Sequence, residues 1–352
     1  MSRLPTSPSG TARGSLVIQT SFLGDVILTT PLIAELAKRG PVDVLVTPEG
    51  AAVLANNPAI RHIIRYDKRG TYGSTLHLWH TIRDLRTRRP YEAAYLAQGS
   101  FRSGLIAMMT GAQERIGFAS STGRALYTKQ LPYRPDRHHA ERLWSLSMSE
   151  CADPPTRDQI RPRLYPSDEE RRAIDVLLLR AGGDEPFVAL APGSAWGTKR
   201  WPYYVELAKV LSADFKIAIV GSKADAKTAE EISAVVPEGS AINTVGALSL
   251  LQSAELIGRA QAIVTNDSAP QHLASAMGTP TLTIFGPTVP EFGFGPLAER
   301  HAVAGNNALS CRPCDRHGPQ KCPLGHWRCM RELGVEYVSS LLNEVLNPPV
   351  PV

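Results

Sequence analysis

Short apolar runs rich in β-branched residues alternate along the chain with longer stretches of helical periodicity. In the first part of the chain this pattern predicts strands at 16–20, 42–47, 60–67 and 93–97 and helices at 24–39, 74–88 and 104–110. In the second part it predicts strands at 187–191, 217–220, 262–265 and 281–285 and helices at 168–180, 203–211, 224–235, 250–258, 270–277 and 335–346. Continuous apolar strands between amphipathic helices are typical of parallel sheets covered on both faces.

A polar, proline-rich segment at 151–166 separates the two series and marks a domain boundary. A chain of 352 residues is also longer than one core usually organises. We therefore predict an α/β protein with two facing, Rossmann-like, doubly wound domains. The expected divisions are a flexible tail at 1–14, an N-terminal domain at 15–165 and a C-terminal domain at 166–334. Residues 335–352 are expected to form a C-terminal helix and tail that could pack back on the N-terminal domain.

Composition narrows the function classes. Hydrophobic residues make up 43% and charged residues 20%, which is globular composition. No apolar run is long enough for a transmembrane helix, and the first residues lack the apolar core of a secretory signal, so we expect a cytoplasmic protein. The net charge of +5 suits either anionic partners or a solubilising surface. Basic runs interleaved with aromatic residues do not occur, which disfavours nucleic-acid binding.

The loops that follow predicted strands carry the candidate chemistry, because ligands of doubly wound sheets bind beyond the carboxyl ends of the strands. Asp25 follows the first strand, where it is either a helix cap or a functional carboxylate. Ser194 and Lys199 lie in the glycine-containing loop 192–202, whose groups suit phosphate oxygens. That loop matches neither the Walker A pattern nor G-x-G-x-x-G.

Two further loops hold acidic residues. Asp267 and Ser268 stand where a helix begins, with His272 one turn later, and the free N–H groups there can bind an anion. Asp225 follows the second strand of the second series, the usual place for an acid that binds a ribose diol. Each of these residues could equally cap its helix or pack against it, and their combination favours a binding site.

The loop sequences together resemble one known family. The segments are SFLGDVILTTP (21–31), APGSAWGTKRWP (191–202), TNDSAPQHLASAMGTPTLTIFGPT (265–288) and CRPC with CPLGHWRCM (311–330). In this order they resemble the ADP-heptose:lipopolysaccharide heptosyltransferases of glycosyltransferase family 9, and the last looks like the heptosyltransferase II branch. The resemblance covers nearly the whole chain. One departure is Ala269, which stands where the family usually has a glycine.

The resemblance implies a GT-B fold and an inverting transfer of heptose from ADP-L-glycero-D-manno-heptose to the inner core of lipopolysaccharide. The N-terminal domain would bind the acceptor, heptosyl-Kdo-lipid A, and the C-terminal domain the donor. The enzyme would work without a cofactor, in peripheral contact with the cytoplasmic face of the inner membrane. The alternatives are a GT-B nucleotide-sugar epimerase and a non-catalytic ADP-sugar-binding protein.

Residue roles follow from the same resemblance. Asp25 would be the catalytic base and Lys199 would stabilise the departing diphosphate. The expected donor-binding residues are Ser194, Lys199, Asp225, Asp267, Ser268 and His272. The expected acceptor contacts are Arg102 and Arg115, with Arg137, His138 and His139 as further candidates. The chain contains no Asp-x-Asp triplet, so we expect no catalytic metal.

Cys311, Cys314, Cys322 and Cys329 form a C-x2-C-x7-C-x6-C pattern, with His317 and His326 between them. Four soft ligands in a short segment make a structural zinc site one interpretation. The family resemblance accounts for the same cysteines without a metal.

Overall fold

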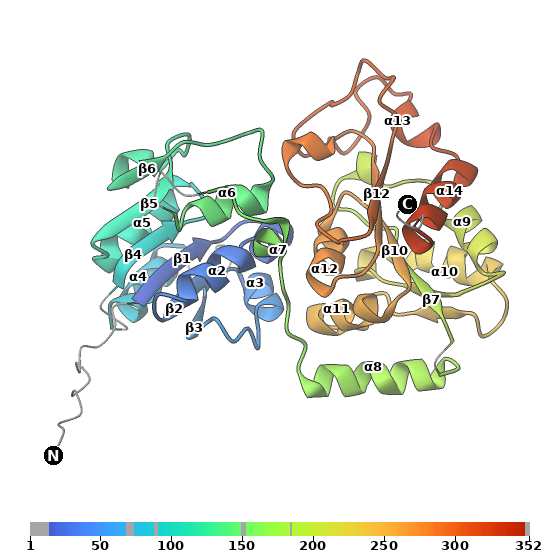
Figure 1. Ribbon diagram of the computed structural model, residues 1–352, viewed down its shortest axis with the longest axis horizontal. Helices are drawn as coiled ribbons and strands as arrows, with labels where there is room; N and C mark the ends of the chain where they lie inside the picture. Colours follow the sequence, from blue (N-terminus) through green and yellow to red (C-terminus); the bar gives the residue numbers. More distant parts are fainter. Residues whose placement is uncertain (1–13, 68–73, 88–90, 149–152, 184, 349–352) are drawn as a thin grey trace.

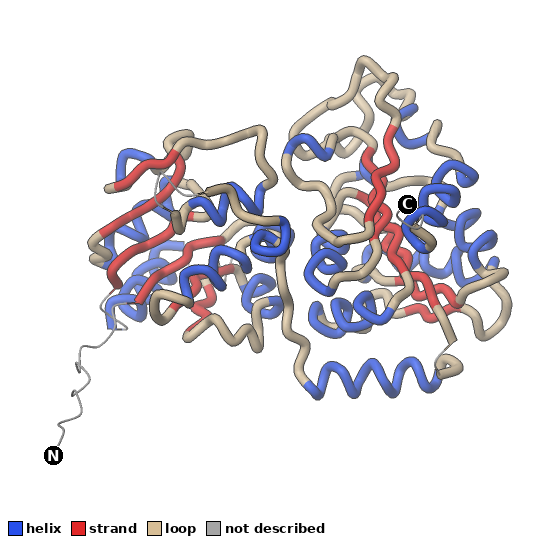
Figure 2. The backbone as a smooth tube through the Cα atoms, in the orientation of Figure 1, coloured by secondary structure: helices blue, strands red, loops and turns tan. Residues whose placement is uncertain are grey.

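The computed structural model describes residues 14–67, 74–87, 91–148, 153–183 and 185–348. The predicted tail therefore lies, except for Gly14, outside the described residues. The described chain forms two lobes, each a parallel sheet with helices on both faces (Figures 1 and 2). This arrangement confirms the two doubly wound α/β domains that the sequence predicts.

The first lobe contains a six-stranded parallel sheet in the order β3-β2-β1-β4-β5-β6. Its strands are β1 (Gly14–Gln19), β2 (Val42–Val46), β3 (His62–Arg65), β4 (Tyr91–Leu96), β5 (Glu114–Phe118) and β6 (Lys129–Leu131). Its helices are α1 (Leu23–Leu28), α2 (Thr30–Ala37), α3 (Pro48–Val53), α4 (Ser74–Thr87), α5 (Phe101–Thr110), η1 (Arg124–Leu126), α6 (His139–Ser145) and α7 (Arg157–Ile160).

The second lobe repeats this strand order, with its sheet running β12-β11-β10-β7-β8-β9. Its strands are β7 (Phe187–Ala191), β8 (Lys216–Ile219), β9 (Ala241–Asn243), β10 (Ala262–Asn266), β11 (Thr281–Phe285) and β12 (His301–Gly305). Its helices are α8 (Asp168–Arg180), η2 (Gly197–Lys199), α9 (Tyr204–Leu211), η3 (Lys223–Asp225), α10 (Ala226–Val235), α11 (Leu250–Arg259), α12 (Ala269–Met277), η4 (Pro290–Phe292), α13 (Arg328–Arg331) and α14 (Val335–Leu346).

All strands are parallel, and the order in which they are added to the sheet switches direction at the same point in both lobes, between β1 and β4 in the first and between β7 and β10 in the second. Connections on either side of that point leave the sheet on opposite faces, so a crevice opens at the carboxyl ends of these central strands. The loops after β1, β7 and β10 therefore lie at this crevice, where a ligand of such a fold would bind.

The helix predicted at 24–39 is broken at Thr29 into α1 and α2. Pro31 is the second residue of α2 and has no N–H to continue the helical ladder. The carbonyl of Ile27 accepts a hydrogen bond from the Thr30 hydroxyl instead, at 2.8 Å. The break lets α1 turn toward the second lobe while α2 packs on α6.

The C-terminal helix differs from the expectation that it could pack back on the N-terminal domain. Helix α14 packs on β10, β11 and β12 and against α9, all in the second lobe (Figure 1). Its buried residues Val338 and Leu342 belong to the apolar core of that lobe. The apolar stripe of α14 is therefore buried within the second lobe.

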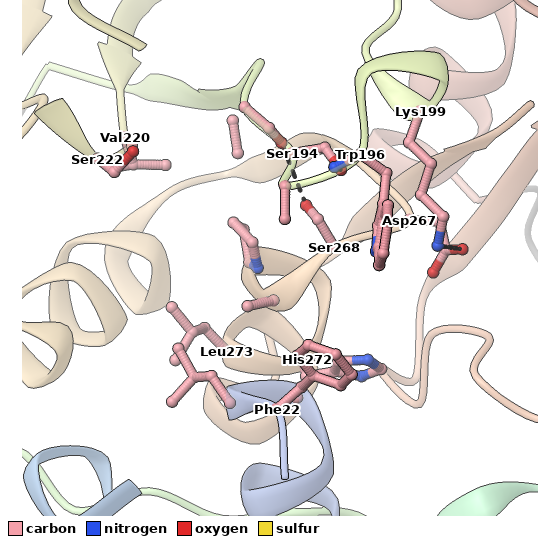
Figure 3. Close-up of a pocket in the computed structure, with 18 of the residues that line it drawn as sticks. Phe22, Ser194, Trp196, Lys199, Val220, Ser222, Asp267, Ser268, His272 and Leu273 are labelled. Carbon is pink, nitrogen blue, oxygen red and sulfur yellow. Dashed lines mark hydrogen bonds and ion pairs between the residues drawn. The ribbon is translucent and has the colours of Figure 1, made fainter. Parts of the chain in front are cut away.

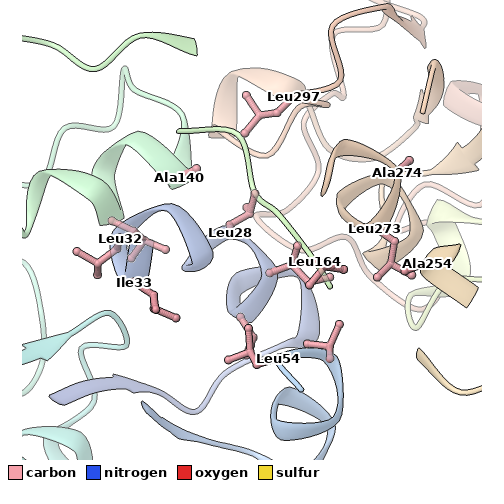
Figure 4. Close-up of a cluster of buried hydrophobic side chains, with 14 of the residues drawn as sticks. Leu28, Leu32, Ile33, Leu54, Ala140, Leu164, Ala254, Leu273, Ala274 and Leu297 are labelled. Carbon is pink, nitrogen blue, oxygen red and sulfur yellow. The ribbon is translucent and has the colours of Figure 1, made fainter. Parts of the chain in front are cut away.

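One apolar cluster runs across the interface between the lobes (Figure 4). Leu28 and Ile33 contribute to it from the first lobe, and Leu273 and Ala274 from α12 of the second. Leu164, in the segment that joins the lobes, packs into the same cluster. Burial of apolar area is the main favourable term in folding, so this shared cluster fixes how the lobes face each other.

Replacing Leu28 tests that coupling. Leu28 is fully buried, so Leu28→Ala should lower the free energy of unfolding by roughly 2–5 kcal/mol through lost burial and the cavity left behind. The matched control is Leu179→Ala on α8, where the side chain is 75% exposed, and it should stay within ~0.5 kcal/mol of wild type. Denaturant unfolding measures both, and equal losses would contradict the assignment of Leu28 to the shared cluster.

Candidate active site

A cavity of about 690 Å³ lies between the lobes at the carboxyl ends of the central strands. The loops after β1, β7, β8 and β10 all contribute to its lining. Figure 3 shows Val220 and Ser222 at one end and the Lys199–Asp267 pair at the other, with Ser194 and Ser268 between them. The cavity is thus elongated and brings together segments that are far apart in the sequence, from Phe22 to His317.

Helix α1 approaches the second lobe closely because Gly24 has no side chain. A Cβ atom at Gly24 would lie 2.7 Å from Cδ2 of His272, closer than packed atoms allow. The backbone of α1 therefore lies directly against the ring of a residue on α12. The next residue is Asp25, and this contact places its carboxylate at the cavity wall.

Each oxygen of the Asp25 carboxylate has a polar neighbour. Ser21 donates a hydrogen bond from Oγ to Oδ2 at 2.7 Å, and Nε2 of His139 lies 3.4 Å from Oδ1. The side chain is 17% exposed, and burial raises the pKa of Asp25 despite the hydrogen bond from Ser21. A carboxylate that is enclosed, oriented and of raised pKa has the properties of a general base. Asp25 also lies in the first turn of α1, where a negative charge stabilises the helix, so the interpretation as a helix-capping residue is correct in part.

Three histidines lie at the lobe interface near this carboxylate. Burial lowers the pKa of His139 to about 3 and those of His138 and His272 to about 4. All three are therefore neutral at pH 7. The ring of His139 contacts that of Phe294 in the second lobe, with centroids 4.8 Å apart and planes inclined by 31°. A neutral imidazole can donate one hydrogen bond to Asp25 without adding a charge.

Lys199 and Asp267 form an enclosed ion pair on the opposite wall. Nζ of Lys199 lies 2.5 Å from Oδ2 of Asp267, and the two side chains are 9% and 10% exposed. Thr288 donates a further hydrogen bond to Oδ2 at 2.7 Å, and Gln271 donates one to Oδ1 at 3.3 Å. Asp267 is thus fixed by three donors, and the pair presents one oriented ammonium group to the cavity.

The hydroxyls of Ser194 and Ser268 lie between the two ends of the cavity. Ser194 accepts a hydrogen bond from the backbone N–H of Trp196 at 3.2 Å. The Ser268 hydroxyl is directed to the carbonyl of Gly193 at 3.4 Å (Figure 3). Asn266 ties the same loops together by donating to the carbonyl of Pro192 at 2.8 Å. Hydroxyls beside the first turn of α12 make this a suitable place for phosphate oxygens.

Asp225 lines the cavity at the end marked by Ser222. Its Oδ2 accepts hydrogen bonds from the N–H and the hydroxyl of Ser222, both at 2.9 Å, so it does cap its own helical turn. A Cβ atom at Gly193 would lie 2.5 Å from Oδ2, which shows how closely the β7 loop approaches this carboxylate. Asp225 therefore lines the cavity and caps the helical turn at the same time.

The structure thus brings the seven predicted catalytic and donor-side residues to one cavity. It does not bring the two predicted acceptor arginines there. Arg102 is exposed at the first turn of α5, outside the cavity lining. Arg115 lies near the start of β5, at the sheet edge opposite the cavity, and donates to the carbonyls of Leu126 and Ala112. Arg115 precedes the main part of a strand rather than following it, and this placement argues against an acceptor contact.

Phe22, Trp196, Arg316 and His317 are among the lining residues that were not singled out for this site from the sequence. The last two come from the segment that contains the cysteines. That segment folds against the β7 loop, where Thr198 donates to Pro319 O at 3.3 Å and Trp327 donates to Thr198 O at 2.9 Å. These hydrogen bonds join residues more than 100 positions apart, and a local sequence pattern cannot predict such a contact.

The four cysteines act as small packing and hydrogen-bonding groups. Cys329 is buried in the second core, and Cys314 donates to the carbonyl of Cys311 at 3.1 Å. Cys311 lies 4.0 Å from Nε2 of His326. Within the described ranges, which contain these four cysteines, no three Cys, His, Asp or Glu side chains converge as metal ligands. The arrangement does not form the tetrahedral set that the zinc interpretation requires.

The described helices include none with both the length and the apolar character needed to cross a bilayer.

Comparison with known proteins identifies the family. The model of "Glycosyltransferase family 9 (heptosyltransferase)" matches residues 78–327. Lipopolysaccharide heptosyltransferase 2 of Escherichia coli K12 is 28% identical over 295 residues, covering 79% of this chain and 84% of that protein. The solved glycosyl transferase family 9 protein of Veillonella parvula has a TM-score of 0.82 at 21% identity, covering 97% of this chain and 99% of that one.

The solved E. coli ADP-heptose lps heptosyltransferase II has a TM-score of 0.75 at 24% identity, covering 95% of this chain and 98% of that one. These likenesses confirm the GT-B architecture of two facing lobes. The family match spans more than half of the sequence and includes the loops that hold Lys199 and Asp267. The chain therefore belongs to glycosyltransferase family 9, the heptosyltransferases.

Proposed function

We propose that this enzyme transfers heptose from ADP-L-glycero-D-manno-heptose to a heptosyl-Kdo-lipid A acceptor in lipopolysaccharide core biosynthesis, with inversion at the anomeric carbon. One observation carries the proposal. An enclosed carboxylate of raised pKa, Asp25, and an oriented ammonium group, Lys199, line the same cavity from different lobes. Names of similar proteins support the donor and the acceptor class.

The donor would lie along the second lobe. Asp225 would accept hydrogen bonds from the ribose hydroxyls, and Ser194 and Ser268 would donate hydrogen bonds to the diphosphate. Asp267 and His272 lie further along the cavity, where the sugar would be. As the bond between the anomeric carbon and the phosphate oxygen breaks, negative charge grows on ADP, and Lys199 would stabilise it.

The acceptor would enter from the first lobe. Asp25 takes the proton from the attacking hydroxyl while that oxygen bonds to the anomeric carbon from the face opposite the leaving diphosphate. Ser21 and His139 hold the two carboxylate oxygens, so the base is oriented before the acceptor arrives. The lipid portion of the acceptor would keep the enzyme in peripheral contact with the cytoplasmic face of the inner membrane.

Incubation with ADP-heptose and truncated lipopolysaccharide acceptors, followed by mass analysis, tests the proposal. We expect one acceptor to gain a single heptose. Consumption of the donor without any acceptor would indicate the epimerase alternative. Binding of ADP-heptose with no turnover on any acceptor would indicate a non-catalytic binding protein.

Replacing the base separates catalysis from binding. Asp25→Asn keeps the shape of the side chain but removes the proton acceptor, so kcat should fall by about 10²–10⁴-fold. The dissociation constant for ADP, measured by calorimetry, should change little. The control is Asp214→Asn, which alters an exposed carboxylate outside the cavity. Wild-type turnover in Asp25→Asn would remove this residue from the mechanism.

The pH profile tests the environment of Asp25. The base must be ionised to act, and its raised pKa means that kcat/KM should decline, as pH falls, at a higher pH than an ordinary aspartate would give. Ser21→Ala removes a hydrogen bond that favours the charged form, so the acid limb should move to still higher pH. Ser212→Ala, at the end of α9, serves as the control. An acid limb that is unmoved in Ser21→Ala would contradict the assignment of that limb to Asp25.

A further inference from the structure

Two arginines meet at the hydroxyl of Tyr133, on the side of the cavity where Asp25 lies. Arg142 of α6 donates to the Tyr133 hydroxyl through Nη1 and to the carbonyl of Phe292 through Nη2, the latter at 2.6 Å. Nη2 of Arg316 lies 3.4 Å from the same hydroxyl. The charges of both arginines act on His139, whose ring faces Asp25. The pair therefore belongs to the acceptor side of the candidate base.

These two positive charges are not balanced by an ion pair. Among the residues that the structure describes, no carboxylate is in salt-bridge contact with Arg142 or Arg316, and Nε of Arg142 has no hydrogen-bond partner. Arg142 is only 3% exposed. The carboxylates of Asp136 and Asp25 attract Arg142 without forming an ion pair with it. A buried guanidinium that has no ion-pair partner is costly, and the charge of Arg316 adds repulsion. An anionic group bound between the two arginines and the cavity would offset both the cost of burying the charge and the repulsion between the guanidinium groups.

Aromatic rings adjoin this charge. His317, the neighbour of Arg316, stacks on Trp196 with centroids 6.1 Å apart and planes inclined by 19°. Phe22 lies 6.0 Å from the same ring and is 63% exposed. Exposed apolar side chains that line a groove mark ligand-binding surfaces. Here exposed Phe22 of the first lobe and half-buried Trp196 of the second both line the cavity.

We infer that Arg316, with Arg142 and Tyr133 behind it, binds an anionic group of the acceptor sugar, and that Phe22, Trp196 and His317 pack against the ring that carries it. This inference rests on the proposed transfer to a lipopolysaccharide acceptor. The anion is a carboxylate or a phosphate, because the planar fork of a guanidinium binds either through two parallel hydrogen bonds. The subsite replaces Arg102 and Arg115 as the anchor of the acceptor.

Kinetics of Arg316→Gln test the subsite. The acceptor KM should rise by roughly 10- to 100-fold through loss of a charge-assisted contact, while the dissociation constant for ADP stays within about twofold. The matched control is Lys321→Gln, which removes one positive charge from the same segment at an exposed position outside the cavity. An unchanged acceptor KM in Arg316→Gln, or an equal loss of ADP affinity, would overturn the inference.

Modified acceptors identify the anion. One acceptor has its carboxylates reduced to alcohols and another has its phosphates removed. With the wild-type enzyme, one of these changes should raise KM about as much as Arg316→Gln does. The same acceptor should give little further loss with the variant, because the contact is already gone. Fully additive losses for both acceptors would overturn the inference.

A binding measurement separates this inference from the proposed function. If wild-type enzyme transfers no heptose to any lipid A acceptor, the proposed function fails. Calorimetry with a delipidated, acidic inner-core oligosaccharide, in the presence of ADP, then decides the subsite independently. Binding by wild type and by Lys321→Gln but not by Arg316→Gln supports it. Equal binding by all three, or by none, overturns it.

Discussion

The close packing of α1 on α12 is the contact on which the rest of the site depends. Gly24 lets the α1 backbone lie against the ring of His272, and the apolar cluster around Leu28 and Leu273 extends this contact across the interface. A side chain at Gly24 would need space that the ring occupies. The lobes therefore face each other in a way that sets Asp25 at the wall of a cavity whose other walls belong to the second lobe.

The two lobes supply different parts of the chemistry. The first contributes a carboxylate in a desolvated setting, and the second contributes an ammonium group and hydroxyls around a helix start. Backbone contacts link them further, because His139 donates its N–H to the carbonyl of Gly293 at 2.7 Å and Arg142 donates to that of Phe292. The side chain that faces Asp25 is thus positioned by the loop of the opposite lobe.

The fold and the gathering of the seven site residues at one cavity could be predicted because they depend on short-range patterns. Apolar runs such as 187–191 and 281–285 give strands directly, and a residue that follows a central strand must lie at the ligand-binding edge. Asp25, Lys199 and Asp267 obey this rule. Arg115 lies instead near the amino end of β5, a strand that was not recognised from the sequence. Arg316 was not singled out from the sequence because its place at the cavity depends on a long loop that folds against another loop.

The proposed mechanism depends on one spatial relation, between Asp25 of the first lobe and the diphosphate of the donor. A crystal structure with ADP bound measures it most directly. We expect the diphosphate oxygens to lie within hydrogen-bonding distance of Ser194 and Ser268, and the ribose to lie beside Asp225. The Asp25 carboxylate should face them across the space left for the sugar. A diphosphate bound elsewhere, or an adenine filling the space in front of Asp25, would contradict it.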